Sequence, residues 1–236
     1  MRLGLNQPYF FPYIGHFSLI QHVDRYIIDD VVQFTDKSWM TRNRILNAQN
    51  GWQYILVPVK RHSSKSPIYE IEIDNEKKWQ IKLLKQMDYY RRAPYFHQVQ
   101  EVVEDIFAVP CTYLAEFNTR ATKKVCAYLD INTPIEVLSQ MNLQYKKPTA
   151  PDEWGLNISL ALPGITEYWN APGGASFYDR RKYQEAGIEI KFQKMILDEY
   201  PQKGDSFEPG LSIIDVMMFN LSLIHISEPT RQAEIS

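Results

Sequence analysis

The sequence predicts an α/β or α+β fold, with a mixed sheet and an inserted helical block at about residues 75–130. Two hydrophobic patterns indicate it. Short apolar or alternating runs, typical of strands, occur toward both ends of the chain, and three longer stretches between them carry apolar residues at helical spacing. These elements do not follow the regular βαβ alternation of a doubly wound fold.

The expected strands are short and comprise 2–6, 25–34, 53–59, 68–73, 135–138, 165–169 and 187–192. The clearest two-residue period is in 68–73, where Tyr69, Ile71 and Ile73 alternate with the other side chains. Pro58 indicates a sheet edge or a strand end, because proline cannot donate to a ladder.

Helical spacing predicts helices at 13–22, 76–90, 94–107, 112–129, 179–186 and 211–220. Gly187 follows the fifth of these, at the position that commonly ends a helix. The stretch 146–152 contains two prolines and is expected to be a loop crossing between parts of the fold.

Composition limits the function classes. The 236 residues suffice for one large domain, and a net charge of −2 with a pI near 6.2 argues against a nucleic-acid partner. The two cysteines form no CxxC pair, no signal peptide precedes the first strand, and no apolar run reaches membrane-spanning length. We therefore expect a cytoplasmic protein without a membrane span. No metal-ligand spacing or dinucleotide motif occurs, so the sequence predicts no metal and no cofactor.

A Pro- and aromatic-rich loop, 7–17, joins the first strand to the first helix. Ligands of α/β proteins favour the loop beyond the carboxyl end of a strand, which makes Gln7, Tyr13 and His16 candidate site residues. The alternative is a corner that packs its aromatic rings into the core.

Asp29 and Asp30 are adjacent in a predicted strand, so their side chains are expected on opposite faces. Either carboxylate could serve as a general base, with its pKa set by burial or by a nearby arginine. The alternative is a structural ion pair with Arg42 or Arg44. Asp215, inside an apolar helix, must be paired or hydrogen-bonded.

A second polar cluster predicts binding of an anionic substrate group. Its candidate residues are Lys37, Trp39, Arg42, Asn43 and Arg44. Guanidinium forks match phosphate or carboxylate, such as a nucleotide-sugar diphosphate or a phosphopantetheine. We expect this cluster to line one cleft with the 7–16 loop and with Asp29 or Asp30. The alternative is a solvated loop with surface charge.

The third candidate binding segment follows a predicted strand. Its residues are Tyr168, Asn170, Gly173 and Gly174, a combination suited to close backbone contact with a sugar or a phosphate. A tight turn is the alternative.

These motifs together resemble the WbqC-like protein family over residues 1–220. The resemblance rests on QPYFFPYIGHF at 7–17, on DDVVQF at 29–34, and on GLSIIDVMMFN at 210–220. His16 departs from it, because an aromatic residue is expected there in many members. The resemblance implies a role in bacterial surface polysaccharide synthesis (O-antigen or lipopolysaccharide), with acyl or aminoacyl (glycyl-type) transfer to an amino sugar as the suggested reaction. A nucleotide-activated amino sugar and an acyl donor would then be its small-molecule substrates.

Two other functions remain open at this point. Tyr13-Ile14-Gly15-His16 is similar to the HxGH loop of nucleotidyltransferases, with Tyr in place of the first His. A non-enzymatic protein that binds a sugar or a partner enzyme is the other. Clustering around one pocket of Asp29 or Asp30 with Tyr13, Arg42 and Asn170 would favour an enzyme, and scatter over the surface would favour the non-enzymatic protein.

The last sixteen residues, 221–236, read LSLIHISEPTRQAEIS. Back-translation of 221–231 resembles a sequencing-library adapter, so we expect an artefactual tail outside the domain. The alternative is a natural helix that ends before Pro229.

Overall fold

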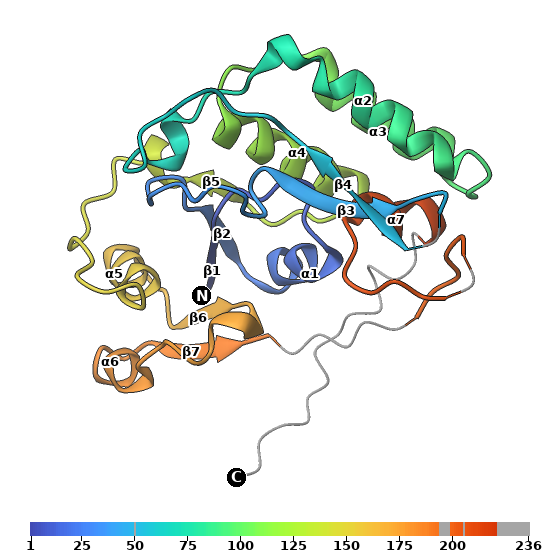
Figure 1. Cartoon of the computed structure of the whole chain (residues 1–236). Coiled ribbons are helices and arrows are strands. Elements are labelled where there is room, and N and C mark those ends of the chain that lie inside the picture. Colours follow the sequence, from blue (N-terminus) through green and yellow to red (C-terminus); the bar gives the residue numbers. More distant parts are fainter. Residues whose placement is uncertain (50, 194–198, 205, 221–236) are drawn as a thin grey trace.

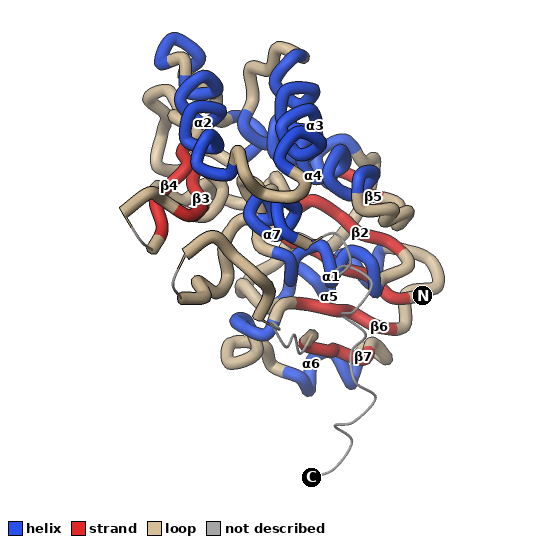
Figure 2. Tube along the Cα trace, turned by 90° about the vertical axis from the view of Figure 1, so that its right-hand side faces the viewer, coloured by secondary structure: helices blue, strands red, loops and turns tan. Residues whose placement is uncertain are grey.

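The computed structural model describes residues 1–49, 51–193, 199–204 and 206–220 (Figure 1). Five parallel strands form the main sheet in the order β5-β2-β1-β6-β7. Figure 2 shows β2 and β5 toward one side of this stack, and β6 and β7 toward the other. The strands are β1 (Arg2–Asn6), β2 (Arg25–Ile28), β5 (Ile135–Val137), β6 (Glu167–Asn170) and β7 (Glu189–Phe192).

The predicted α/β class is confirmed, but its sheet is wholly parallel. Antiparallel pairing occurs in a separate two-stranded sheet of β3 (Arg42–Leu46) and β4 (Trp52–Leu56). Regular βαβ crossovers, which the sequence did not predict, are present as well. Helices α1 (Ile14–His22), α5 (Glu153–Ala161) and α6 (Arg180–Glu185) each connect two strands of the main sheet.

Apolar side chains cover both faces of the main sheet. Tyr26 and Ile28 of β2 enter the larger core cluster, which also holds residues of α1 and α7. Ile27 enters the smaller one, with Leu156 of α5 and Tyr183 of α6. Because successive side chains of a strand point to opposite faces, helices pack on both sides of the sheet.

The predicted helical block is confirmed between β2 and β5. It consists of α2 (Trp79–Met87), α3 (Phe96–Ala108) and α4 (Leu114–Tyr128), and α7 (Ile213–Phe219) packs near α3 and β3. Short 3₁₀ turns complete the described secondary structure. They are Ile68–Glu70, Asn75–Lys77, Asp88–Tyr90, Leu138–Gln140 and Pro172–Gly174.

The predicted strand at 68–73 is wrong, because Ile68–Glu70 form a 3₁₀ turn and the remainder makes only isolated bridges. Ile71 N–H donates to the carbonyl of Ile68, a local bond that removes this donor from any ladder, and Ile73 makes only an isolated bridge. The strand predicted at 25–34 ends at Ile28. Beyond it, the carbonyls of Asp30 and Val32 accept from the turn at Ile68 and Tyr69 instead of from a strand.

Asp215 is fully buried in α7 and has three hydrogen-bond donors. Tyr90 and Tyr200 hydroxyls donate to its carboxylate at 2.7 and 2.6 Å, and Gln202 Nε2 at 2.8 Å. These bonds tie the segment before α7 to the helical block, so Asp215 is a structural residue. Within the described residues, no helix has the length and apolar character needed to cross a bilayer.

Candidate functional site

A cavity of about 790 Å³ opens where three parallel strands end. Asn6 and Gln7 come from the end of β1, Asp29 from the end of β2, and Asn170 from the end of β6. β1 is flanked by β2 on one side and by β6 on the other, so strand order reverses between β1 and β6. Open α/β sheets bind their ligands at such a switch point, and we call this hollow the switch-point cavity.

Aromatic and uncharged polar side chains dominate its lining. The aromatic members are Tyr9, Trp154, Tyr168, Phe177 and Tyr178, and the polar members are Asn6, Gln7, Asp29, Gln33, Thr149 and Asn170. In the described part of the chain, no Lys, Arg or His lines it. Rings and amides of this kind suit a neutral or cationic polar ligand better than a phosphate.

Asp29 is the only charged residue in this lining, within the described residues. Its backbone N–H donates to Asn6 O at 2.8 Å, which fixes it beside the end of β1. The side chain is 5 % exposed, and its Oδ1 has no hydrogen-bond partner in the described structure.

Burial raises the pKa of Asp29 to about 7, and the negative charge of Asp30 adds to this. The backbone amides of Val31 and Val32 hydrogen-bond the carboxylate and hold the pKa lower than burial alone would. A carboxyl with this pKa can accept and release a proton near neutral pH. Burial, with the charge of Asp29 second, also raises the pKa of the nearby Tyr9 to about 12, so its hydroxyl stays protonated.

Asn170 fixes two tyrosines in the cavity wall. Its Nδ2 lies 3.0 Å from Tyr168 Oη and 2.5 Å from Tyr178 Oη, and its Oδ1 accepts from Ala171 N–H at 2.7 Å. Both polar ends of the amide are therefore used within the protein. Asn170 positions the rings. Tyr168 is buried beneath the wall, and the half-buried Tyr178 presents the surface that a ligand would meet.

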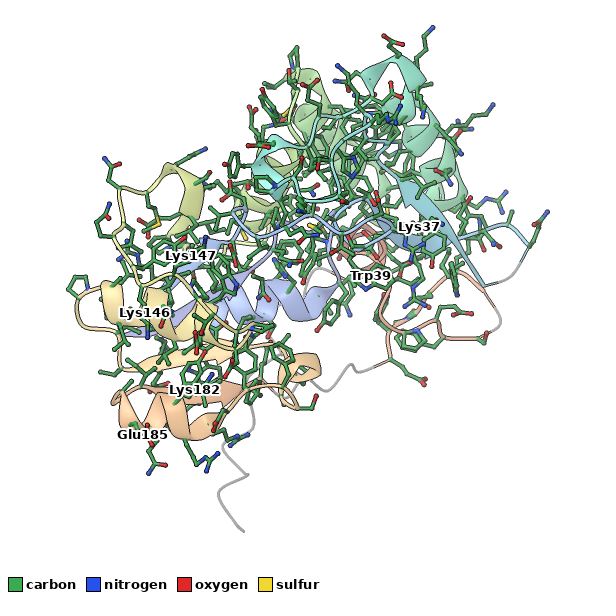
Figure 3. All side chains as sticks on the ribbon, turned by 60° about the vertical axis from the view of Figure 1, so that its left-hand side comes forward. Lys37, Trp39, Lys146, Lys147, Lys182 and Glu185 are labelled. Carbon is green, nitrogen blue, oxygen red and sulfur yellow. The ribbon has the colours of Figure 1, made fainter. Side chains whose placement is uncertain are left out.

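Gly155 allows α5 to pack closely enough to form one wall of the cavity. A Cβ at this position would lie 2.3 Å from Tyr168 Cζ, well inside van der Waals contact. The glycine lets α5 pack directly on the Tyr168 ring, and it brings Trp154 and the loop 148–151 to the cavity wall. Figure 3 shows Lys146 and Lys147 in the chain leading to this loop.

The switch-point cavity brings together six of the residues selected from the sequence. They are Gln7, Asp29, Tyr168, Asn170, Gly173 and Gly174. Sequence reasoning missed Tyr9, Gln33, Trp154 and Tyr178. Tyr9 lies in the Pro-rich signature itself, and Trp154 follows the proline loop that was predicted, so both carried a signal.

His16 and Tyr13 lie outside the lining. His16 is 5 % exposed, with its Nε2 3.0 Å from Tyr26 Oη and the rings of Tyr9 and Phe17 beside it. Burial lowers its pKa to about 3, so the imidazole is neutral at physiological pH. Tyr13 caps α1, and its half-buried ring lies over Gly15, where a Cβ would come within 2.3 Å.

Asp30 faces a different hollow, which we call the α4 cavity. This hollow measures about 590 Å³, and Tyr69 and Lys123 also line it. The Asp30 carboxylate accepts from Ser139 N–H at 2.9 Å and from Ser139 Oγ–H at 2.5 Å. These bonds explain the buried Asp30 carboxylate as a structural group that holds Ser139.

The 37–44 segment contacts the 7–16 loop, as predicted, but lines a different surface. Phe10 N–H donates to Trp39 O at 2.9 Å, and Asn43 Nδ2 donates to the carbonyls of Phe10 and Phe11. None of residues 37–44 lines the switch-point cavity, so the expected common cleft with Asp29 is not formed. Figure 3 shows Lys37 and Trp39 beside the β3–β4 hairpin, away from Lys146 and Lys147.

Arg42 and Arg44 make no ion pair with Asp29 or Asp30 in the described structure. The Arg42 guanidinium lies over the Tyr54 ring, 4.8 Å from its centroid. Arg44 lies over Trp39 and Trp52 and donates to the carbonyl of Gly210. The proposed tail, 221–236, lies outside the described residues. Among those described, no group of three or more His, Cys, Asp or Glu side chains could hold a metal ion.

Comparison with known proteins gives one family and one relative. The model of the WbqC-like protein family matches residues 7–223. The chain is 30 % identical over 224 residues to the uncharacterized protein Rv1507c of Mycobacterium tuberculosis (strain ATCC 25618 / H37Rv), covering 93 % of this chain and 94 % of that protein. No solved structure matches.

Proposed function

The chain belongs to the WbqC-like protein family, and from this premise we propose that it is a transferase of bacterial surface polysaccharide synthesis. In this proposal the switch-point cavity binds an amino sugar, and Asp29 is the general base for acyl or aminoacyl transfer to its amine. The observation that carries the proposal is the buried carboxyl of Asp29, a residue of the cavity lining whose pKa is about 7 and whose Oδ1 has no partner in the described structure.

The proposed step needs one proton acceptor. The amine nitrogen attacks the carbonyl carbon of the activated acyl donor, and Asp29 takes the proton that the nitrogen loses. The bond from the carbonyl carbon to the leaving group then breaks, and the leaving group departs with the electron pair. A base whose pKa is near the working pH is well matched to this transfer.

The lining supports a sugar as the acceptor. Tyr9, Trp154 and Phe177 offer rings for the apolar faces of a sugar, and Gln7 and Gln33 offer amides for its hydroxyls. The absence of cationic side chains from the described lining favours the sugar part of a substrate here over its diphosphate.

Nucleotidyl transfer is less well supported. It would use the imidazole of the Tyr13–His16 loop to bind phosphate, but His16 is 5 % exposed and enclosed by aromatic rings. A neutral imidazole in the core offers neither charge nor access to a phosphate.

The test is mass spectrometry of nucleotide-activated amino sugars incubated with the protein and a panel of acyl donors. We expect a product with the acyl mass added, formed faster as pH rises through about 7. Asp29→Asn should lower the rate by at least about a hundredfold, the usual contribution of a general base. Asp30→Asn, one residue away and facing another cavity, is the matched control. It should retain the rate per folded molecule, with the pH profile moved to lower pH because the Asp30 charge helps to raise the pKa of Asp29.

Two results would count against this proposal. Full transfer by Asp29→Asn would exclude Asp29 as the base. Equal sugar binding by wild type and Asp29→Asn, with no product from any donor, would favour the non-enzymatic binding protein.

A further inference from the structure

One stretch of the chain is strongly basic although the whole protein is slightly acidic. Residues 37–69 contain six Lys and Arg side chains and no Asp or Glu, whereas the net charge of the chain is −2. The stretch contains the β3–β4 hairpin and the Lys37–Arg44 cluster, which the switch-point cavity does not use.

One face of this hairpin combines its cations with aromatic rings. Arg42 lies over Tyr54, and Arg44 lies 5.8 Å from the Trp39 ring and 5.1 Å from the Trp52 ring. We call these five residues the Arg–Trp face. The antiparallel register places Arg44 opposite Tyr54, which puts both side chains on the same side of the hairpin.

The rings of this face are unusually accessible. Trp39 is 46 % exposed and Trp52 is 37 % exposed, and Leu56, opposite Arg42 on the same side, is 46 % exposed. Large apolar groups gathered on a surface commonly mark an interaction site.

Within the described part of the chain, neither guanidinium has a negative partner. In the described structure the Arg42 side chain makes no hydrogen bond or ion pair, and its Nε is buried without a partner. The Arg44 guanidinium donates only to the backbone carbonyls of Pro209 and Gly210. Both charges are therefore held in place by rings and remain available to an external anion.

We propose that the Arg–Trp face docks the protein on an anionic membrane surface. Tryptophan and tyrosine rings prefer the headgroup level of a bilayer, and basic side chains are attracted to anionic headgroups. The proposal concerns a surface apart from the switch-point cavity and does not depend on the proposed reaction.

The shape of this face favours a membrane over a small anion. Neither the switch-point cavity nor the α4 cavity is lined by a residue of the hairpin, and Figure 1 shows β3 and β4 apart from the main sheet, next to α7. A fluid interface can accept projecting tryptophans and Leu56 without a complementary pocket.

The test is sedimentation with vesicles of phosphatidylcholine, with or without about 30 % phosphatidylglycerol. Wild type should bind the anionic vesicles, and added salt should release it. Arg42→Gln should lower the partition coefficient about fivefold, which corresponds to about 1 kcal/mol per basic side chain. The Arg42 side chain makes no hydrogen bond in the described structure, and the change leaves its backbone pairing in β3 in place, so the fold is expected to stay intact.

Two further variants sharpen the result. The double variant Trp39→Ala, Trp52→Ala should weaken binding and abolish any blue shift of tryptophan emission on vesicle addition. Arg180→Gln is the matched control, because Arg180 also lies over a ring, that of Phe192 at 5.3 Å, but on α6. It should leave vesicle binding unchanged. Circular dichroism checks the fold of each variant.

Failure of wild type to bind anionic vesicles would overturn the proposal. So would equal weakening by Arg42→Gln and Arg180→Gln, which would indicate nonspecific charge attraction. Retention on immobilised polyglutamate through Arg42, without vesicle binding, would overturn it in favour of an acidic macromolecule.

Discussion

Asp29 and Asp30 are neighbours in the chain, but their carboxylates face different cavities. Asp29 lines the switch-point cavity and leaves Oδ1 unpaired in the described structure, whereas Asp30 lines the α4 cavity and binds Ser139. The backbone N–H of Asp29 still donates to the carbonyl of Asn6, as the next residue of the β1–β2 ladder would. Successive side chains therefore continue to point to opposite faces beyond the end of β2. One carboxylate thus remains available for chemistry, and the other is occupied in holding the fold.

Asp29→Asn should stabilise the protein at about pH 8. The pKa of Asp29 is raised from 3.8 to about 7, so between these values the folded state binds more protons than the unfolded state. The free energy of unfolding therefore falls as pH rises through this window, and the full cost is present above pH 7. Asparagine carries no charge, so we expect a gain of roughly 1–3 kcal/mol at about pH 8 and none below about pH 4.

Urea unfolding at both pH values measures this difference, with Asp30→Asn as the neighbouring control. A variant that is no more stable than wild type at pH 8 would show that the Asp29 carboxylate is better solvated or paired than the structure indicates. If Asp29→Asn is more stable than wild type but inactive, Asp29 is a site residue whose charge lowers the stability of the fold.

Asp30→Ala should destabilise the protein without weakening sugar binding. The change removes the acceptor of two bonds from Ser139 and leaves the Ser139 N–H without its partner. Hydrogen bonds to charged groups are worth roughly 1.5–3 kcal/mol, and we expect a loss of that size. A double-mutant cycle with Ser139→Ala should give a favourable coupling energy, and strictly additive losses would contradict a direct interaction.

Much of the fold could be predicted because its elements have simple hydrophobic periods. The first strand was predicted with its observed bounds, Arg2–Asn6, and α1 within one residue. Helix α5 was missed because its buried residues, Gly155 to Ser159, are consecutive and form no stripe. Strand β3 was missed because the arginines at positions 42 and 44 leave too few apolar residues to form a recognisable strand pattern.

The residues of the candidate site likewise fall into those that a local sequence pattern indicates and those that depend on the tertiary fold. Gln7 and Asn170 could be selected because each lies at or just beyond a predicted strand end, where parallel strands bind their ligands. Asp29 was selected as one of two adjacent acids inside a predicted strand, and only the structure shows that this strand ends at Ile28. Trp154 and Tyr178 depend on the packing of α5 and of a loop, which no local pattern encodes. Arg42, Asn43 and Arg44 belong to a separate two-stranded sheet, and only the tertiary fold shows this.

His16→Phe should lower the stability of the protein at neutral pH, but the variant should lose less stability than wild type as the pH falls. The imidazole pKa is lowered from 6.5 to about 3, so between these values the unfolded state binds more protons and stability falls as pH drops. Phenylalanine removes this slope, but it leaves the Tyr26 hydroxyl without its imidazole partner at a cost of roughly 1–3 kcal/mol. Thermal unfolding from pH 4 to 8 should show the melting temperatures of wild type and His16→Phe converging in acid. Parallel curves of melting temperature against pH would place the His16 pKa near its ordinary value.

Gly155→Ala tests how tightly α5 is held against the cavity. Helix propensity alone predicts a gain of up to about 1 kcal/mol, because alanine is the better helix former. The added Cβ would overlap the Tyr168 ring, which is 1 % exposed and hydrogen-bonded by Asn170 and Tyr178. Since this ring has little room to move, we expect a net loss of roughly 1–3 kcal/mol in urea unfolding and weaker sugar binding.

Gly173→Ala is the matched control for this change. It lies in the same cavity wall, but no atom comes within 4 Å of the added Cβ, so its stability should stay within about 0.5 kcal/mol of wild type. If Gly155→Ala instead gained the stability that propensity predicts, α5 would have to stand farther from β6 than the structure places it. The cavity wall that includes Trp154 and Tyr168 would then be wider than in this structure.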